Sequence, residues 1–292
     1  MSVPQLANNH PSLLYALLSV SALYLSKVEP QDLDLKAAHR NYFGLALRSH
    51  RSAITSLDAK SVDAVCFTSV LIAVHAFAEL QDRVLGEVYE PPMQWLHMSN
   101  GVCNIFHIAG KWVKDGAAIN AIVKSAPILS DPDTLFGERN REGLANLLLP
   151  LRRVDVSHFQ GDEEDSEDEE TKEAYEKTLS YIGAVQAAIK AGEHSMGICR
   201  LLIAFAVLIP KKMIELLEKE KPGALVVLAH YFALTGLLVE PNDEIWWIGK
   251  IAKREVEGIQ KYLPEEWQEL MNWPLSVVKP VAVGKGKNRD GT

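Results

Sequence analysis

Residues 62–80 read VDAVCFTSVLIAVHAFAEL, and this stretch indicates the fold class more strongly than any other part of the chain. Apolar residues occupy almost every side of the helix that it would form, which is typical of a helix buried on both faces. Ser61 is a suitable N-cap for this helix, and Asp63 lies in its first turn, where a negative charge is favourable. The stretch therefore predicts a helix that other helices cover from both sides.

Three further segments share this pattern and lack a broad polar face: residues 13–25, 196–209 and 224–239. Amphipathic helices are predicted around them, for example over residues 34–56 and 172–191. The sequence shows no alternating strand pattern and no Asn-Gly hairpin signal. The expected fold is all-α, a multi-layer helical bundle with buried central helices and an internal apolar cavity. The helix of residues 13–25 is expected to be one of the central ones.

An acidic run, DEEDSEDEE at residues 162–170, divides the chain in sequence. It holds eight of the 38 acidic residues, which leaves 30 acidic residues against 30 basic ones in the whole chain. Such a run is usually a solvated linker and less often an interaction tail. We expect a short helix over residues 144–154 before it. The predicted organisation is a single domain of residues 1–275, with the acidic linker at 161–171 inside it and a disordered tail at 276–292.

Charge and cysteine content exclude several classes of protein. Nucleic-acid binders present a basic stripe to phosphates, and none is evident here, so no direct binding to nucleic acid is expected. Cys66, Cys103 and Cys199 are odd in number, widely spaced and without a C-x-x-C pair, so neither disulfides nor a zinc cluster are predicted. Residues 13–25 follow no basic region and are too short to span a bilayer. The predicted location is cytoplasmic and/or nuclear, not secreted, without membrane insertion.

No motif for catalysis, phosphate binding or metal ligation occurs, so no metal and no cofactor are predicted. His75, His230 and Tyr231 are the candidates for chemistry because they lie in apolar helices. A histidine in such a position is usually a hydrogen-bonded core residue; the alternative is a group that contacts a ligand or transfers a proton. Glu79 can share a helix face with His75. The candidate ligand-binding residues are Phe67, Leu71, His75, Trp95, Met98, Phe205, His230, Tyr231, Leu234 and Trp247.

Four stretches resemble a single family: residues 3–26, 37–47, 62–80 and 245–274. The first contains His10-Pro11 before an Ala- and Leu-rich helix, and the last contains Trp246-Trp247, then Leu-Pro-x-x-Trp and Trp-Pro. In these features the chain resembles the C-terminal regulatory domain of fungal Zn(II)₂Cys₆ transcription factors, in the sterol uptake regulator branch. The resemblance implies an all-α domain that often dimerises and that encloses a sterol in sterol-sensing members. The three cysteines here provide no counterpart of that family's six-cysteine DNA-binding module.

Two functions from different classes follow. The first is binding of a lipophilic small molecule, sterol-, terpenoid- or polyketide-like, by a stand-alone regulator-like protein that forms a homodimer or pairs with a related regulator. The alternative is an enzyme repurposed from this domain, a cyclase or pericyclase of Diels–Alder type in fungal secondary metabolism. Its pocket would hold the substrate near the reacting geometry, and a donor such as His75, His230 or Tyr231 would polarise it. The third hypothesis is a gene fragment without activity of its own.

Overall fold

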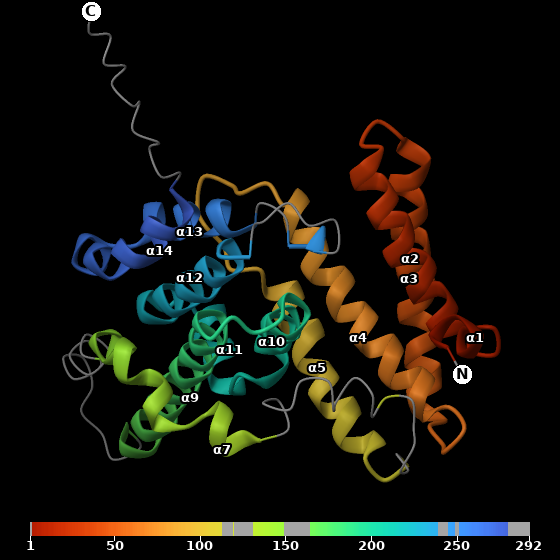
Figure 1. Cartoon of the computed structure of the whole chain (residues 1–292), viewed down its shortest axis with the longest axis horizontal. Helices are drawn as coiled ribbons and strands as arrows, with labels where there is room; N and C mark the ends of the chain where they lie inside the picture. Colours follow the sequence, from red (N-terminus) through yellow and green to blue (C-terminus); the bar gives the residue numbers. More distant parts are fainter. Residues whose placement is uncertain are drawn as a thin grey trace, which may run out of the picture.

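The computed structural model describes residues 2–112, 119, 131–148, 164–238, 245–248 and 251–279, and for residues 164–168 only the main chain. Within these ranges every regular element is a helix, which confirms the all-α prediction (Figure 1). Residues 280–292 of the expected tail lie outside the described residues.

The N-terminal part is a helical hairpin. It follows the short helix α1 (Val3–Ala7) and consists of α2 (Pro11–Val28) and α3 (Leu33–Thr55). Asp32 begins α3 as an N-cap, since its carboxylate accepts hydrogen bonds from the main-chain N–H groups of Asp34 and Leu35. Ser19 joins the two helices by donating to the main-chain oxygen of His39 at 3.1 Å.

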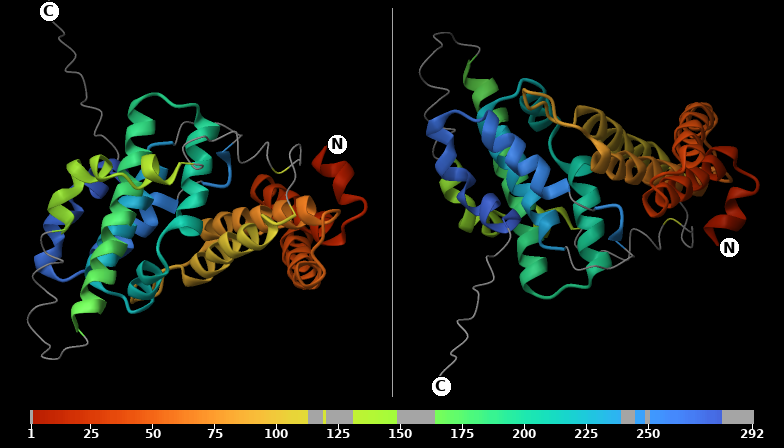
Figure 2. Two further views of the ribbon diagram at one scale, coloured as in Figure 1. Left: turned by 90° about the horizontal axis from the view of Figure 1, so that it is seen from below. Right: turned by 90° about the horizontal axis from the view of Figure 1, so that it is seen from above.

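The middle part is a pair of long helices, α4 (Val62–Glu79) and α5 (Met93–Ala109), and the short helix η1 (Leu80–Asp82) continues α4. In both views of Figure 2, α4 and α5 run side by side from the hairpin toward the C-terminal helices. The N-terminal half of α4 contributes Val62, Ala64 and Cys66 to a small core with α1 and α2. Its C-terminal half contributes Ala76 and Phe77 to the main core. This helix therefore joins the two cores.

The C-terminal part packs around α12 (Pro222–Gly236), in which every residue from Gly223 to Thr235 is buried. This confirms the prediction of a fully apolar central helix. A close approach between η3 and α9 depends on a glycine, because a Cβ at Gly183 would lie 1.8 Å from the carbonyl oxygen of Asn140. The other elements of this part are α7 (Pro132–Leu135), η3 (Glu138–Leu147), α9 (Glu164–Lys190), α10 (Ser195–Leu208), α11 (Lys211–Glu218), α13 (Ile251–Tyr262), η6 (Glu265–Met271) and α14 (Asn272–Val278).

The expectation that the helix of residues 13–25 is central is wrong. α2 buries Leu13 and Leu23 against its neighbours, but it leaves Leu14, Leu18 and Leu25 exposed by 38, 37 and 42%. An apolar composition on all sides predicts burial only where other helices are present to cover every side. Here α2 packs mainly against α3 and α4, so its outer side faces solvent.

Three expected boundaries also differ from the structure. Most of the acidic run is helical, because α9 begins at Glu164. Residues 138–147 form the 3₁₀ helix η3, so the first part of the helix expected over 144–154 belongs to a 3₁₀ helix that begins earlier; residues 149–154 lie outside the described part of the chain. The expected tail at 276–292 overlaps α14, which ends at Val278.

Two segments, Pro11–Val28 and Val62–Asp82, are long and apolar enough to cross a membrane by length and composition alone. The second is 72% buried inside the protein, as expected of a core helix, and the first is 39% buried.

Candidate functional site: a cleft beside a buried His-His-Glu cluster

A cleft of about 490 Å³ lies between the end of α4, the segment of residues 83–92, the start of α5 and the end of α11. Its apolar side is formed by Ala76, Leu80, Pro91, Pro92, Met93 and Trp95. Its polar side is formed by Glu79, Arg83, Glu90, Gln94, Glu218 and Glu220. The lining of the cleft therefore combines apolar side chains, here called its floor, with polar side chains, here called its rim. Most residues of the rim are carboxylates.

The wall formed by residues 83–92 is held in place by a buried carboxylate. Glu255 of α13 has no exposed side-chain surface, and it accepts hydrogen bonds from Arg83 Nη1 at 3.1 Å and from the Tyr89 hydroxyl at 3.0 Å. Arg83 also donates to the main-chain oxygen of Glu90. One turn along α13, a Cβ at Gly258 would lie 2.5 Å from Leu85 Cδ1 and 2.9 Å from Tyr89 Cδ2, so this wall packs closely against the glycine.

The rim offers more hydrogen-bond acceptors than donors. Burial raises the pKa of Glu79, although Arg40 and Lys27 act in the opposite direction. Glu220 accepts a hydrogen bond from the Tyr262 hydroxyl, and Arg83 is bound by Glu255. The Nε1–H donor of Trp95, a lining residue, is buried without a hydrogen-bond partner among the described residues; so is Ser99 Oγ, one turn further along α5 and outside the cleft lining. Polar groups of this kind are satisfied by water or by a ligand in most proteins.

Glu79 also belongs to a second group of residues, the cluster of His39, His75 and Glu79. His75 Nδ1 lies 3.6 Å from one carboxylate oxygen of Glu79, and His39 Nδ1 lies 3.9 Å from the other. The His75 ring stacks on Phe43 with a centroid distance of 4.0 Å and is 1% exposed. Burial lowers the pKa of His75 to about 3 and also lowers that of His39, so both imidazoles are neutral at physiological pH.

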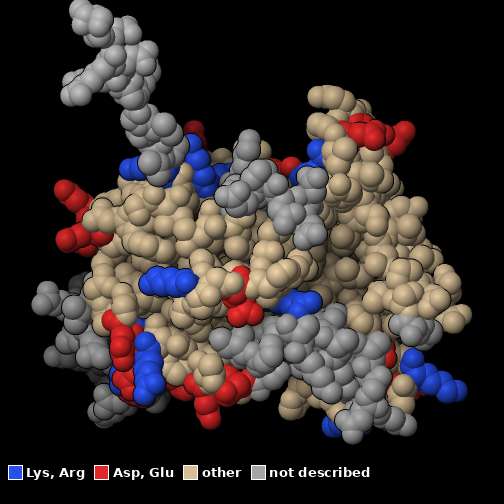
Figure 3. Space-filling model, in the orientation of Figure 1, with Lys and Arg blue, Asp and Glu red and all other residues tan. Residues whose placement is uncertain are grey.

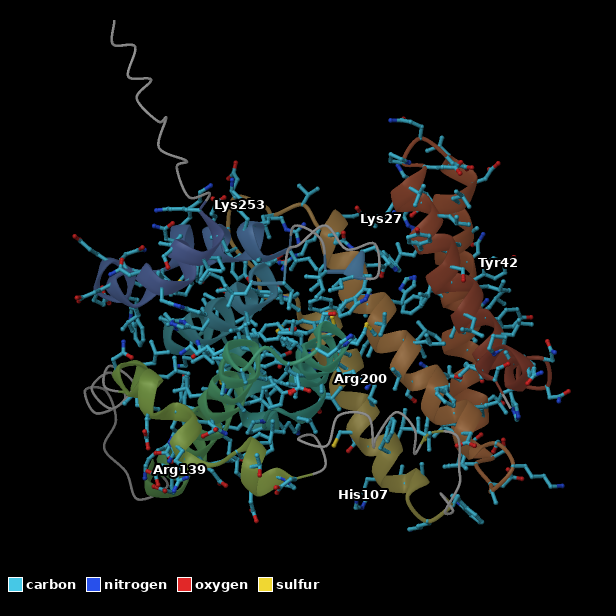
Figure 4. All side chains as sticks on the ribbon, viewed as in Figure 1. Lys27, Tyr42, His107, Arg139, Arg200 and Lys253 are labelled. Atoms are coloured by element: carbon cyan, nitrogen blue, oxygen red, sulfur yellow. The ribbon has the colours of Figure 1, made fainter. Side chains whose placement is uncertain are left out.

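Charged neighbours surround the cluster on its hairpin side. Lys27 forms an ion pair with Asp82 of η1, and Figure 4 shows Lys27 between the hairpin and the end of α4. Arg40 is the next basic residue in sequence after His39, and its charge lowers the pKa of both His39 and Glu79. Because two cations and two carboxylates lie here, the formal charge of this region is balanced.

The structure brings several sequence-predicted site residues into one aromatic stack. The rings of Phe205 and Tyr231 lie 3.8 Å apart, and those of Trp95 and Tyr231 lie 5.7 Å apart. The Tyr231 hydroxyl donates to the main-chain oxygen of Leu202 at 2.9 Å, and burial raises its pKa well above the usual value. Leu234 and Trp247 belong to the same core, and Met98 packs against it. Of the ten predicted residues, Trp95 is the one that lines the cleft.

The remaining predicted residues lie elsewhere. Phe67 belongs to the small N-terminal core, and Leu71 packs against it. His230 stacks on Trp273 at 5.3 Å, and its Nδ1 lies 2.9 Å from the main-chain oxygen of Val226. Burial lowers the pKa of His230 to about 4. His75 lies in the His-His-Glu cluster.

His39 and most residues of the rim are absent from the sequence-predicted site residues. His39 has the helical spacing of a core residue, because Phe43 and Ala46 follow it at four and seven positions and all three are buried. That pattern was a usable signal for its burial. The rim carboxylates of Glu90, Glu218 and Glu220 carried no such signal, because charged residues near helix ends are common on any surface.

On the face drawn in Figure 3, the Lys and Arg side chains of the described residues are scattered, and they form no continuous basic stripe.

Comparisons with known proteins support the family resemblance. Residues 3–89 match the fungal specific transcription factor domain. The chain is 32% identical over 239 residues to the Zn(2)-C6 fungal-type transcription factor afumD of Aspergillus fumigatus, an alignment that covers 81% of this chain and 60% of that protein. It is 26% identical to a Zn(2)-C6 fungal-type transcription factor of Gibberella zeae, with 94% of this chain and 55% of that protein covered.

A more distant relative belongs to the sterol branch named above. The Sterol uptake control protein 2 of Saccharomyces cerevisiae is 23% identical, over 91% of this chain and 27% of that protein. No solved structure matches the chain. The chain thus spans about 60% or less of each of these relatives. Residues 3–89 thus match the fungal specific transcription factor domain, and the chain is similar, over most of its length, to fungal Zn(2)-C6 transcription factors.

Proposed function

We propose that this chain is a regulator-like protein, acting in the nucleus or cytoplasm, that binds a lipophilic small molecule in the cleft beside Trp95. The observation that carries the proposal is an open, partly apolar cleft lined by Trp95, whose buried Nε1–H has no hydrogen-bond partner among the described residues. Its volume of about 490 Å³ lies within the range of small-molecule sites in proteins. Similarity to a family of transcription factors makes a regulatory role the natural context.

The chemistry of the cleft favours one class of ligand. An apolar skeleton would cover Leu80, Met93 and Trp95, and each Å² of apolar surface removed from water contributes about 25 cal/mol. A hydroxyl or amine at one end of that skeleton would donate to Glu79 or Glu218 on the rim. A sterol-, terpenoid- or polyketide-like molecule with one such donor has both properties.

The cyclase or pericyclase alternative gains less support. It requires a donor that reaches a bound substrate, and two of the three candidate donors contact main-chain carbonyls: Tyr231 at Leu202 and His230 at Val226. We therefore advance ligand binding alone.

A matched pair of substitutions tests the proposal. Met93 and Met196 both lie in the first turn of a helix, where an aspartate is favourable, but only Met93 lines the cleft. We expect a sterol or terpenoid ligand at 100 times its Kd to stabilise the wild-type protein and Met196→Asp by about 2.7 kcal/mol in thermal unfolding. Met93→Asp should fold normally and lose this stabilisation. The cleft would be ruled out as the binding site if the ligand stabilised both variants equally, or if no lipophilic compound stabilised the wild-type protein.

Association with a second copy or with a related regulator also stays a proposal. The outer side of α2 offers a surface for it, because Leu14, Leu18, Leu25 and Val28 are exposed and recur at helical spacing. We expect Leu18→Glu to shift the protein toward the monomer in sedimentation equilibrium. A wild-type protein that is monomeric at every concentration, alone and with a related regulator, would contradict this.

A further inference from the structure

The His-His-Glu cluster contains buried polar atoms that the packing of the protein leaves unexplained. Both ring nitrogens of His75 and Nδ1 of His39 are buried and have no hydrogen-bond partner within the described residues. His75 is 1% exposed and His39 is 5% exposed. Buried nitrogens of this kind are uncommon in native proteins, and each requires an explanation such as a water molecule or an ion.

The arrangement of the three side chains has the form of a metal site. One ligand atom from each of His39, His75 and Glu79 lies within 4.8 Å of the other two. The carboxylate of Glu79 lies near both imidazoles, with Nδ1-to-oxygen distances of 3.6 and 3.9 Å, and the two rings lie 5.6 Å apart between their centroids. These distances exceed those of a hydrogen bond, so the carboxylate does not satisfy either ring. Ligand atoms of a tetrahedral zinc ion lie about 3.3 Å apart, so modest side-chain rotations would bring these atoms to bonding positions.

We propose that His39, His75 and Glu79 bind a divalent transition-metal ion, with Zn²⁺ the expected occupant. Two imidazole nitrogens and one carboxylate are a donor set that Zn²⁺ takes in sites where a fourth position stays open for water or another ligand. His75 and Glu79 lie one turn apart on α4, so the helix presents both on one face. The third ligand comes from α3, which explains why spacing along the sequence predicted no metal site.

The open position would face the cleft. Glu79 lines the cleft, and its side chain is 34% exposed, so the cleft provides a route for the ion and room for a fourth ligand. On the opposite side, Phe43 stacks against His75 and excludes solvent. A metal here would bind an oxygen atom of whatever occupies the neighbouring part of the cleft. The metal site itself does not depend on the ligand proposed above.

The charged residues near the metal site do not provide its affinity for cations. Lys27 and Arg40 balance Glu79 and Asp82, so no negative field attracts cations in general. Affinity must therefore come from the ligating atoms themselves. This predicts selectivity for Zn²⁺ and Co²⁺ over Mg²⁺, because Mg²⁺ prefers oxygen ligands and gains little from imidazole.

Metal titration of the full chain tests the proposal. The purified protein is freed of metal with a chelator and titrated with Zn²⁺ by calorimetry and with Co²⁺ by visible absorption. We expect one equivalent of each ion to bind, with the absorption of four-coordinate Co²⁺, and no comparable binding of Mg²⁺. Glu79→Gln and His39→Asn should each weaken Zn²⁺ binding at least tenfold. Glu79→Gln preserves shape at a partly exposed position, so circular dichroism should show a normal fold even if His39→Asn is unstable.

Two control variants separate this site from adventitious binding. His50→Gln removes another buried histidine of α3, one whose Nε2 lies 3.0 Å from Ser69 Oγ. Glu218→Gln removes a different carboxylate of the cleft. Both should bind Zn²⁺ as the wild type does. If Glu79→Gln keeps the wild-type affinity for Zn²⁺, or if the wild-type protein binds no equivalent of Zn²⁺, the proposal fails. The buried nitrogens of His39 and His75 then contact water instead.

Discussion

Glu255→Ala is expected to lower the free energy of unfolding by about 3–5 kcal/mol, because it removes one partner of a buried ion pair. Glu255 is fully buried and contacts two guanidinium groups and one hydroxyl. Arg254 Nη2 lies 2.9 Å from Oε1, and Arg83 Nη1 and the Tyr89 hydroxyl lie 3.1 and 3.0 Å from Oε2. Removing the carboxylate leaves these groups with unbalanced charge and an unpaired donor in a region of low polarity. Chemical denaturation followed by tryptophan fluorescence measures the loss.

A neighbouring residue provides the control for this prediction. Glu257 lies on the same helix, is partly exposed and contacts only Lys253 at 3.9 Å among the described residues. Glu257→Ala should change the free energy of unfolding by no more than about 0.5 kcal/mol, as for most exposed ion pairs. Since Glu255 holds the cleft wall through Arg83 and Tyr89, Glu255→Ala should also weaken ligand binding. If Glu255→Ala and Glu257→Ala have equal effects, the buried network contributes little.

His50 and His230, two buried histidines, are together expected to contribute about 4 kcal/mol of destabilisation when the pH falls from 7 to 5. Burial lowers the pKa of each from 6.5 to about 4. The unfolded chain therefore takes up protons below pH 6.5, whereas the folded chain does not until about pH 4. Stability from these groups is complete above pH 6.5 and is lost as the pH falls toward 4, at up to about 1.4 kcal/mol per pH unit for each group.

Single substitutions isolate this effect from the rest of the protein. His50→Gln and His230→Gln should each reduce the loss of stability between pH 7 and pH 5 by about 2 kcal/mol relative to the wild type. Measurements in a chelating buffer exclude any contribution from bound metal. An unchanged pH dependence in both buried variants would contradict the assignment.

The sequence predicted the fold class and the central helix α12 well, because a segment apolar on all sides has few alternatives to burial in a helix. The same apolar pattern wrongly predicted that α2 is a central helix, because the composition of a helix does not say how many other helices pack against it. The sequence also did not indicate that the acidic residues from Glu164 onward form the start of α9. The glutamates in that segment have good helix propensity, and an amphipathic helix follows them. The helix can therefore extend toward the N-terminus through these glutamates.

The candidate site was harder to predict than the fold. The aromatic and apolar candidates were chosen because they lie in apolar helices, and most of them form the packed core around Tyr231. Trp95 and His75 reach the cleft or the His-His-Glu cluster because they lie near the junction of α4 and α5, where the chain turns through Pro91 and Pro92. His39 joins them from another helix. Which residues of different helices lie together depends on tertiary packing, and the periodicity along one helix gives no information about that packing.

The central claim is that a lipophilic ligand occupies the cleft, and protection of a cysteine placed at Met93 tests it most directly. In Met93→Cys, the natural Cys103 is exposed and provides an internal reference, while Cys66 and Cys199 are buried. We predict that a saturating sterol or terpenoid ligand slows alkylation of Cys at position 93 by at least tenfold and leaves Cys103 unchanged, as read by peptide mass spectrometry. Equal alkylation of position 93 with and without a ligand that binds the protein would contradict the account.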